Sequence, residues 1–400
     1  MSSEWPKVPL GECTDIVAGA TPSTSVEGYW DGDVCWATPK DLSELHGAYI
    51  SDTPRKLTRM GLDSCAATIL PAGSVLFSSR APIGHVAMNT VPMATNQGFK
   101  SFVPKVERLD AKFLYWWLRT NRGYLESLGN GATFKEVSKT VVSRIQIPLP
   151  PLAEQRRIAE VLDQAEALRA KRRVALAQLD FLTQSLFLDL FGDAGENAKG
   201  WPVHAVADYV AEFQGGKSID SQSGDNVITR NRVLKVSAVT GMKFLADESK
   251  PVPDSYEPPE EHFAKPGDLL FSRANTTELV GAVAYVESTP PNVLLPDKLW
   301  RFVWREPAAI EPLFVWALFQ TPTLRREIGR RATGTSGSMK NISQEKVFGI
   351  RTILPPIESQ REFARRVRAV ENLKTTQRAS LAELDALFAS LQHRAFRGEL

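Results

Sequence analysis

The stretch LPPLAEQRR, residues 149–157, returns near the end of the chain as LPPIESQRE, residues 354–362. The two copies align without gaps, and Pro150 and Pro355 lie 205 residues apart. We call this spacing the repeat period, and it is about half of the 400-residue chain. We therefore interpret the protein as a duplicated unit, in which each copy carries this stretch in the same structural role.

Each copy of this stretch opens a long amphipathic segment. Apolar residues recur at alternating steps of three and four, which is the pattern of a heptad seam. No internal Pro or Gly occurs from 153 to 191 or from 358 to 396, and Gly192 and Gly398 stand where helices commonly end. The sequence predicts two helices of about 40 residues, each about 60 Å long. The predicted seam consists of Ile158, Val161, Ala165, Leu168, Leu179, Leu182, Phe363, Val370, Leu373, Leu384, Leu387 and Leu391.

The segments before the helices match more loosely. Trp5-Pro6 is matched by Trp201-Pro202, and PAGSVLFSSR at 71–80 is matched by KPGDLLFSR at 265–273. The predicted fold class is α+β, with two tandem mixed α/β modules that each precede a long helix. The expected boundaries are 1–150 and 193–353 for the modules, and 151–192 and 354–400 for the helices.

The repeat also predicts how the helices pair. The first helix leads away from the first module and the second begins at the second module, so their seams meet if the helices run antiparallel. The chain ends fit this plan. Phe191 and Trp201 are 10 positions apart, and the corresponding Phe396 would be 9 positions from Trp5 if the chain ends were joined. We expect an antiparallel coiled coil and approximate two-fold symmetry between the modules.

Composition places the chain among ordinary soluble globular proteins, with 43% hydrophobic and 24% charged residues. No continuous apolar run reaches the roughly 18 residues that span a bilayer. The N-terminus lacks the basic start and apolar core of a signal peptide. Cys13, Cys35 and Cys65 form neither a disulfide framework nor a zinc pattern. The expected compartment is the cytoplasm.

Positive charge gathers at corresponding places in the two modules. Nine Lys and Arg residues face four acidic residues between Lys100 and Arg144, and seven face two between Gln320 and Arg351. Each basic region contains a loop rich in Gly, Ser and Asn, at 130–139 and 333–346. Basic side chains neutralise phosphates, and polar loops can enter a groove and read base edges. Two such modules predict a two-part site on double-stranded DNA, with unlike halves because the loops differ.

Enzyme signatures are weak or absent in the sequence. GGKS at 215–218 resembles the end of a phosphate-binding loop, but Ala211 stands where that motif needs a glycine. Its counterpart in the first module is GATPS at 19–23. The five histidines show no metal-ligand spacing, and no Pro-Pro pair forms the Asp/Asn-Pro-Pro-aromatic loop of an adenine methyltransferase. We expect no catalytic residue, metal site or cofactor in this chain.

A module followed by LPPLAEQRR and a long helix, repeated in tandem, resembles the specificity (S) subunit of type I restriction–modification enzymes. The resemblance covers essentially the whole chain. It is most specific at 149–159, at 354–364 and in the phrase HRAFRGEL at 393–400. The second copy departs from the first, with Glu358-Ser359 in place of Ala153-Glu154, so partner contacts are expected to differ between the two ends.

The resemblance implies a non-catalytic subunit with two target-recognition domains separated by antiparallel helices. Such a subunit would recognise a bipartite, asymmetric DNA site with a nonspecific spacer. It would position methyltransferase (M) subunits and endonuclease/translocase (R) subunits, two of each. S-adenosylmethionine, ATP and Mg would be bound by those partners. The helix seam would set the spacer, and the outer helix faces would dock the M subunits.

The residues expected to contact DNA lie in loops that correspond between the modules. Arg, Asn and Gln are favoured because their side chains can make bidentate contacts with guanine or adenine. In the first module the candidates are Thr21, Lys40, Ser79, Arg80, Asn96, Gln97, Lys135 and Lys139. In the second module they are Lys217, Ser218, Lys235, Arg273, Asn275, Lys298, Lys340 and Asn341.

Three alternatives stay open. The first is a fused methyltransferase or nuclease, against which the missing Pro-Pro-aromatic loop argues. The second is the specificity subunit of a related system in which methyltransferase and nuclease are fused in one partner chain. The third is a coiled-coil scaffold that binds only proteins, which explains the helices but not the paired basic loops.

Overall fold

The computed structural model describes residues 5–80, 82–131, 135–219, 229–336 and 339–400. The chain divides into two compact units. Unit 1 comprises Met1–Arg173 and Ala379–Leu400, and unit 2 comprises Val174–Arg378. Each unit therefore contains one module together with part of both long helices, α7 (Leu152–Phe191) and α13 (Ile357–Ala395).

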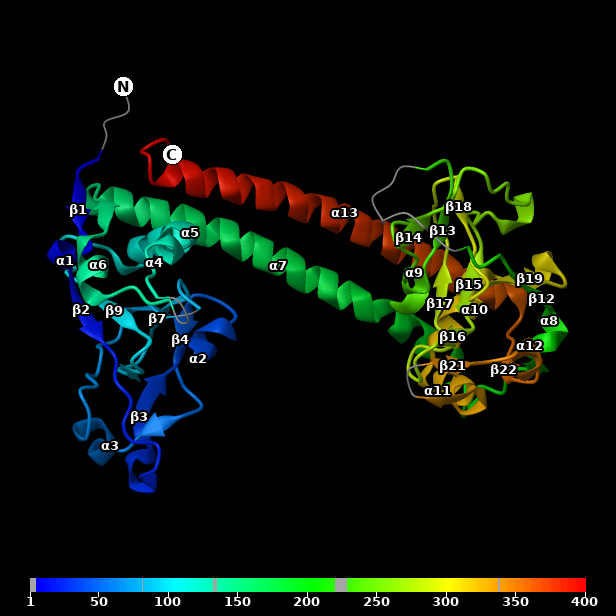
Figure 1. The fold of residues 1–400 in the computed structure, drawn as a ribbon, viewed down its shortest axis with the longest axis horizontal. Coiled ribbons are helices and arrows are strands. Elements are labelled where there is room, and N and C mark those ends of the chain that lie inside the picture. Colours follow the sequence, from blue (N-terminus) through cyan, green and yellow to red (C-terminus); the bar gives the residue numbers. More distant parts are fainter. Residues whose placement is uncertain (1–4, 81, 132–134, 220–228, 337–338) are drawn as a thin grey trace. The chain divides into compact units, whose positions relative to one another are not determined.

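Unit 1 is built on a five-stranded sheet in the order β2-β9-β6-β7-β4 and a three-stranded sheet in the order β5-β3-β8. Strand β1 pairs with β10, so the start of the module lies beside its end (Figure 1). Its elements are β1 (Lys7–Pro9), α1 (Leu10–Cys13), β2 (Thr14–Ala18), η1 (Glu27–Tyr29), β3 (Trp30–Ala37), α2 (Pro39–Ser43), β4 (Tyr49–Ile50), β5 (Lys56–Leu57), α3 (Arg59–Asp63), β6 (Val75–Phe77), β7 (Val86–Asn89), β8 (Ala94–Thr95), β9 (Lys100–Pro104), α4 (Ala111–Thr120), α5 (Arg122–Ser127), α6 (Lys139–Arg144) and β10 (Gln146–Pro148).

Unit 2 is built on a four-stranded sheet in the order β12-β19-β15-β17, two three-stranded sheets, β14-β13-β18 and β16-β21-β20, and the pair β11-β22. Its elements are β11 (Val203–Ala205), α8 (Val206–Tyr209), β12 (Val210–Gly215), β13 (Arg232–Leu234), α9 (Ser237–Thr240), β14 (Ser249–Pro251), η2 (Glu260–His262), β15 (Leu269–Ser272), β16 (Ala274–Asn275), β17 (Val283–Tyr285), β18 (Val293–Leu294), β19 (Leu299–Trp304), η3 (Pro307–Ala309), α10 (Pro312–Gln320), α11 (Pro322–Arg331), β20 (Thr333–Ser336), β21 (Met339–Asn341), α12 (Gln344–Phe348) and β22 (Arg351–Ile353).

The two modules share one scaffold. The order β2-β9-β6-β7 in unit 1 is repeated as β12-β19-β15-β17 in unit 2, and the parallel pair β3–β8 is repeated as β13–β18. Even the helix caps repeat, because Ser138 caps α6 and Ser343, one repeat period later, caps α12. The predicted α+β fold of two tandem modules, each followed by a long helix, is confirmed.

The long helices begin where a buried glutamine anchors them. The Gln155 side chain is fully buried, accepts the backbone N–H of Asp110 at 2.8 Å and donates to the carbonyl of Pro150 at 2.8 Å. Gln360 accepts the N–H of Glu311 at 3.0 Å and donates to Pro355 at 2.8 Å. The glutamine in each copy of the repeated stretch therefore ties the first turn of a helix to the start of α4 or α10.

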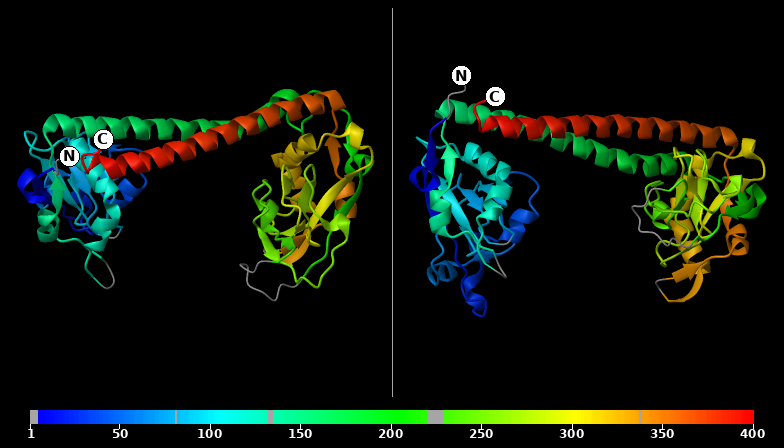
Figure 2. Two further views of the ribbon diagram at one scale, coloured as in Figure 1. Left: turned by 90° about the horizontal axis from the view of Figure 1, so that it is seen from above. Right: turned by 45° about the horizontal axis from the view of Figure 1, so that its top comes forward.

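Helices α7 and α13 pair antiparallel, as predicted, and their lengths of 40 and 39 residues confirm the expected 40. In unit 1, Arg169 of α7 contacts Asp385 of α13. In unit 2, Asp180 of α7 contacts Lys374 of α13. The two helices lie side by side in each view (Figure 1, Figure 2). The approximate two-fold symmetry concerns how the units are placed relative to each other, and it stays a prediction.

The predicted seam needs a correction. Leu168, Leu182, Leu373 and Leu387 are 54%, 38%, 46% and 53% exposed, so they lie outside the seam. The residue after each of them packs instead: Arg169 (side chain 15% exposed), Thr183, Lys374 and Phe388. The two basic residues are tolerated there because each meets a carboxylate of the other helix. A pattern that looks only for apolar residues is one position too early at these four places, whereas Ile158, Phe363 and Val370 of the predicted seam are buried.

Within the part of the chain that the structure describes, one helix, α7, is long and apolar enough to cross a membrane by length and composition alone. An 18-residue window in it has a mean hydropathy of 1.3, and only 17% of that window is buried. The sequence shows no continuous apolar run here because polar residues interrupt it. The apolar residues of α7 thus lie on its outer side as well as on its seam.

Candidate nucleic-acid interface

Three loops of unit 1 meet at the end of its sheets. The loop after β2 approaches the loop after β8 so closely that the N–H of Ala20 bonds the carbonyl of Thr95 at 2.9 Å. A Cβ on Gly19 would stand 1.9 Å from the carbonyl oxygen of Asn96, so only glycine fits there. In this position the hydroxyl of Thr21 donates to the side-chain carbonyl of Gln97. Two candidate residues are therefore brought into contact.

The segment after β6 joins the same cluster. Both Ser79 and Arg80 donate their N–H groups to the carbonyl of Gly98, at 2.8 and 3.3 Å. The N–H of Gly98 in turn bonds the side-chain oxygen of Asn96 at 2.9 Å. Arg80, Asn96, Gln97 and Thr21 thus lie on one continuous loop surface. The predicted DNA contact of Ser79 is wrong, because its side chain is fully buried and donates to the carbonyl of Gly98 at 3.1 Å.

An ion pair that sequence reasoning missed fixes the arginine of this surface. Glu136 accepts from Arg80 at 2.6 Å and from Lys100 at 3.2 Å. Partial burial opposes ionisation, yet the bonds from Arg80 and Lys100 outweigh it and hold the pKa of Glu136 below its usual value. The signal was present in the sequence, because Glu136 is the one carboxylate inside the loop 130–139. Residues 132–134 of that loop lie outside the described residues.

Unit 2 repeats the arrangement with other side chains. The N–H of Gly216 bonds the carbonyl of Pro296 at 3.1 Å, as Ala20 bonds Thr95 in unit 1. This equivalence supports interpreting GGKS as a shared loop. Lys217 extends from it and lies 5.5 Å from the ring centre of Tyr256. Arg273 donates its backbone N–H to Lys298 at 3.1 Å and its Nε to the carbonyl of Asp297 at 2.9 Å.

A short hairpin completes the unit 2 surface. Strand β16 pairs with β21, which sets Ala274 opposite Asn341 and Asn275 opposite Lys340. The Lys340 ammonium bonds the carbonyl of Gly334 across the hairpin at 2.8 Å. Arg273, Asn275, Lys298, Lys340 and Asn341 therefore share one neighbourhood. Residues 337 and 338 of the hairpin lie outside the described residues.

The arginines of the two units are not equivalent, although both follow the matched LFS stretch. Ser79 donates its N–H to Gly98, and Arg273 makes the matching bond to Lys298, so Arg273 occupies the position of Ser79. Arg80 corresponds instead to Ala274. The backbone of Arg80 pairs with Glu136 in an antiparallel β-bridge, as the backbone of Ala274 pairs with Asn341. The guanidinium groups of Arg80 and Arg273 are therefore attached at adjacent positions of the shared scaffold, not at equivalent ones.

The remaining candidates are less closely connected to these clusters. Lys40 is exposed on α2, and Pro39 of the same helix lies close to Gly98. Lys135 is exposed and lies close to Gly129. Ser218 is exposed at the end of its described loop. Lys139 begins α6, and Lys235 follows β13 and donates its backbone N–H to Glu248 at 2.8 Å. The assignment of Lys139 and Lys235 to a DNA-binding surface rests on charge alone.

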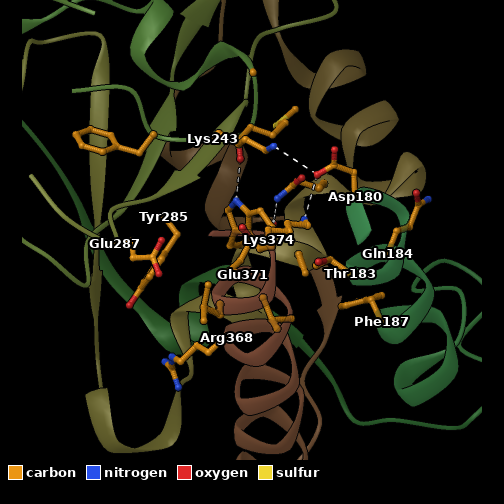
Figure 3. Close-up of a pocket in the computed structure, with 18 of the residues that line it drawn as sticks. Asp180, Thr183, Gln184, Phe187, Lys243, Tyr285, Glu287, Arg368, Glu371 and Lys374 are labelled. Atoms are coloured by element: carbon orange, nitrogen blue, oxygen red, sulfur yellow. Dashed lines mark hydrogen bonds and ion pairs between the residues drawn. The ribbon is translucent and has the colours of Figure 1, made fainter. Parts of the chain in front are cut away.

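The helices carry a polar cluster that is distinct from the loops. In unit 2, Lys374 is 3% exposed and contacts Glu371 at 2.7 Å and Asp180 at 3.2 Å. Lys243 approaches Asp180 from the module at 3.7 Å. Figure 3 shows these four side chains on one wall of a cavity of about 680 Å³, which Phe187 and Tyr285 also line.

The cavity reflects one difference between the repeats. Phe388 of unit 1 contacts Trp116, with ring centres 5.6 Å apart, and lies 4.2 Å below the guanidinium of Arg169. Its counterpart one repeat period earlier is Thr183, which is too small to fill that space in unit 2. The buried hydroxyl of Thr183 lacks a hydrogen-bond partner among the described residues. The cavity is therefore a packing difference at the helices, and none of the candidate DNA-contacting residues lines it.

No group of three or more His, Cys, Asp or Glu side chains in the described ranges could hold a metal ion. The loop clusters offer arginine, lysine, amide and hydroxyl groups on short, backbone-braced turns. This chemistry suits hydrogen bonding to phosphates and base edges.

Comparison with known proteins identifies relatives of this chain. The family model described as the type I restriction modification DNA specificity domain matches residues 2–177. The MjaIX specificity subunit of Methanocaldococcus jannaschii is 32% identical over 232 residues, which cover 54% of each chain. The EcoKI specificity subunit of Escherichia coli K12 is 27% identical over 344 residues, 80% of this chain and 73% of the relative. The first of these matches thus spans about half the length of the relative.

Solved structures share the fold. The S subunit of the type I restriction–modification system of M. genitalium has a TM-score of 0.58 at 14% identity, covering 98% of this chain and 96% of that one. A chain from a structure addressing complex assembly and conformational transition of the type I R-M system has a TM-score of 0.63 at 19% identity, covering 99% and 98%. At these identities the likenesses show the fold alone.

Proposed function

Because the chain belongs to the family of type I restriction–modification DNA specificity subunits, we propose that it is the DNA-reading, non-catalytic subunit of such a complex. Residues 1–150 and 193–353 are the target-recognition domains, and residues 151–192 and 354–400 are the spacer helices. Each domain reads one half of a bipartite, asymmetric double-stranded DNA site, and the bases between the halves are not read.

One observation carries the proposal: the same scaffold presents a clustered loop surface in each unit, with different side chains. Thr21, Arg80 and Gln97 line the surface of unit 1, and Lys217, Arg273 and Lys340 line that of unit 2. A scaffold that merely bound proteins would not need two basic surfaces at equivalent points. Different side chains on equivalent loops favour two half-sites of different sequence.

Catalysis then belongs to partners. We assign methylation to M subunits that hold S-adenosylmethionine, and cleavage with ATP-driven translocation to R subunits, with two copies of each. A methyltransferase that acts on a flipped adenine needs its DNA placed accurately, and this chain supplies that placement. The complex acts on DNA in the cytoplasm. A partner in which methyltransferase and nuclease are fused would use the same reading surfaces.

The test is a methylome. The chain is co-expressed with the methyltransferase encoded beside it in a host that lacks adenine methylation, and N6-methyladenine is located by sequencing. A gapped, asymmetric motif that vanishes when the chain is omitted supports the proposal. Methylation that does not depend on the chain would refute the DNA-reading role and favour the protein-binding scaffold.

A further inference from the structure

The cavity of unit 2 lies where unit 1 holds two large aromatic side chains. In unit 1, Phe388 packs against Trp116 with ring centres 5.6 Å apart, and both side chains are buried. The residue of unit 2 that corresponds to Phe388 is Thr183, and the residue that corresponds to Trp116 is Ala317. Both line the cavity of about 680 Å³. A benzene ring and an indole ring are thus absent from unit 2 at adjoining positions.

Two repeated contacts establish that Ala317 corresponds to Trp116. Each lies six residues after the residue whose backbone N–H the anchoring glutamine accepts, which is Asp110 before α4 and Glu311 before α10. The phenylalanine three positions before each of them also contacts a phenylalanine at the end of a long helix, with ring centres 5.4 and 4.9 Å apart. The same two positions of the scaffold therefore carry Trp in one unit and Ala in the other.

The lining of the cavity suits a neutral, planar, mostly apolar molecule. Its volume falls in the range of about 300–1,000 Å³ that is typical of ligand pockets, which are apolar with a few polar groups. Four basic and four acidic side chains line it, so the lining carries no net charge. The apolar lining comes from α7, α10, α13 and β17, and includes Phe187, Leu313, Trp316, Val367 and Tyr285.

One buried polar group in this cavity has no partner. The hydroxyl of Thr183 forms no hydrogen bond with any described residue, although a threonine inside a helix can bond the carbonyl four residues before it. Thr183 is only 9% exposed and lines the cavity (Figure 3). An unpaired buried hydroxyl costs free energy, and a ligand N–H or O–H group that bonds it removes that cost.

Unit 1 also shows which charge accompanies a ring at this place. The guanidinium of Arg169 lies 4.2 Å from the centre of the Phe388 ring. Arg169 corresponds to Lys374, which is 3% exposed and lines the cavity of unit 2. An aromatic ring bound in the place of Phe388 would therefore lie against the Lys374 ammonium and gain a cation–π contact.

We propose that the cavity of unit 2 binds a small, neutral, planar aromatic molecule that carries an N–H or O–H group. Its ring lies beside Lys374 in the place of the Phe388 and Trp116 rings, and its N–H or O–H group donates to Thr183. The ligand joins α7 and α13 to α10 within unit 2, as two aromatic side chains join the helices to the module in unit 1. This inference goes beyond the proposed function and does not rest on it.

The probe is indole, compared with indene, which has the same ring shape but no N–H group. Binding to the full chain is measured by isothermal titration calorimetry, without DNA or a partner protein. We expect one indole site with a dissociation constant on the order of 0.1 mM, as the size of the ligand allows. Indene should bind about fivefold more weakly because it lacks one hydrogen bond. Indole should also raise the midpoint temperature of thermal unfolding.

Three variants locate the site. Thr183→Phe combined with Ala317→Trp, the filled variant, copies the unit 1 side chains into the cavity and should bind indole at least about tenfold more weakly. Thr183→Val keeps the cavity but removes the hydroxyl, so it should abolish the preference for indole over indene. Leu182→Phe is the matched control, because it adds the same ring at a neighbouring residue that is 38% exposed and does not line the cavity. It should bind both probes like the wild type.

Absence of indole binding to the wild type at millimolar concentration would overturn the inference. Gain of thermal stability by the filled variant would in that case identify the cavity as a packing defect only. Wild-type affinity in the filled variant would also overturn it. If the filled variant does not fold, as judged by circular dichroism, Thr183→Val decides, and an unchanged preference for indole contradicts the proposed site. These measurements involve neither methylation nor DNA, so their failure is distinct from failure of the proposed function.

Discussion

Arg169 of α7 and Asp385 of α13 form an ion pair at 2.6 Å in unit 1. Their equivalents one repeat period away, Lys374 and Asp180, form the matching pair at 3.2 Å in unit 2. Each basic residue also contacts the glutamate three positions before it, Glu166 or Glu371. The two units thus share an ion pair between α7 and α13, which the sequence of either helix alone does not predict.

The Lys374 contact makes a prediction for stability. Lys374→Met keeps the apolar stem but removes the charge that two carboxylates share, and we expect the free energy of unfolding to fall by about 2 kcal/mol. Urea unfolding followed by circular dichroism measures the change. The matched control is Leu373→Ser, one residue away and 46% exposed, which should change stability by less than about 0.5 kcal/mol. Equal effects of the two variants would show that the contact does not stabilise the helix pair.

Acid should weaken this helix pair. Burial raises the pKa of Asp180, but the bonds and charges of Lys374, Lys243 and Arg378 outweigh it, and the pKa lies below its ordinary value of 3.8. The folded pKa is lower than the unfolded one. The contribution to stability is therefore complete above the unfolded value and is lost as pH falls through the folded value. Unfolding free energies from pH 6 to pH 3 should fall less steeply for Asp180→Asn, and identical slopes would contradict the assignment.

The glutamine anchors predict a larger loss. Gln155→Ala removes the acceptor of the Asp110 N–H and the donor to the carbonyls of Arg108 and Pro150. Because these groups are left unpaired in a buried place, we expect a loss of about 2–4 kcal/mol. Gln164→Ala, at an exposed position of the same helix, is the control and should be nearly neutral. Calorimetry of both variants measures the loss of stability. A Gln155→Ala protein as stable as the Gln164→Ala protein would show that Gln155 does not anchor the helix.

The reading surface of unit 1 predicts a change restricted to one half-site. Arg80→Ala should relax or abolish recognition of one or two bases in one half of the motif, at a cost of about 1–3 kcal/mol in discrimination. Glu136→Gln should broaden the same half more mildly, because Glu136 only positions Arg80. Methylomes of both variants check this. Changes in both half-sites at once would contradict independent reading by the two units.

Much of this architecture could be predicted from the repeat. The helices, their antiparallel pairing and the shared modules all follow from residues that match at one fixed spacing. Such matches indicate that two segments share a structure, which the helix or strand propensity of a single segment does not. The contacts between the loops after β2 and β8, and between their counterparts in unit 2, followed in the same way. Gly19 and Gly216 are required by close backbone approaches that the matched segments share.

The seam and the finer site could not be predicted in this way. Arg169 and Lys374 occupy seam positions because the other long helix, far away in the sequence, offers each of them a carboxylate, and no local pattern contains that information. The exposed leucines next to them looked like core residues because they repeat at heptad spacing. Likewise the role of Glu136 depends on Arg80, which lies in a different loop of the module, and the offset between Arg80 and Arg273 depends on strand register.

The most direct test of the account lengthens both helices together. Duplicating residues 173–179 and 378–384, which are equivalent in the repeat, adds one heptad to each helix, or about 10 Å along the axis. The methylome of this variant, co-expressed with the methyltransferase, should show the same two half-site sequences separated by about three more base pairs, at about 3.4 Å per base pair. An unchanged gap, or half-site sequences that change with helix length, would contradict the claim that two independent readers are held apart by the helix pair.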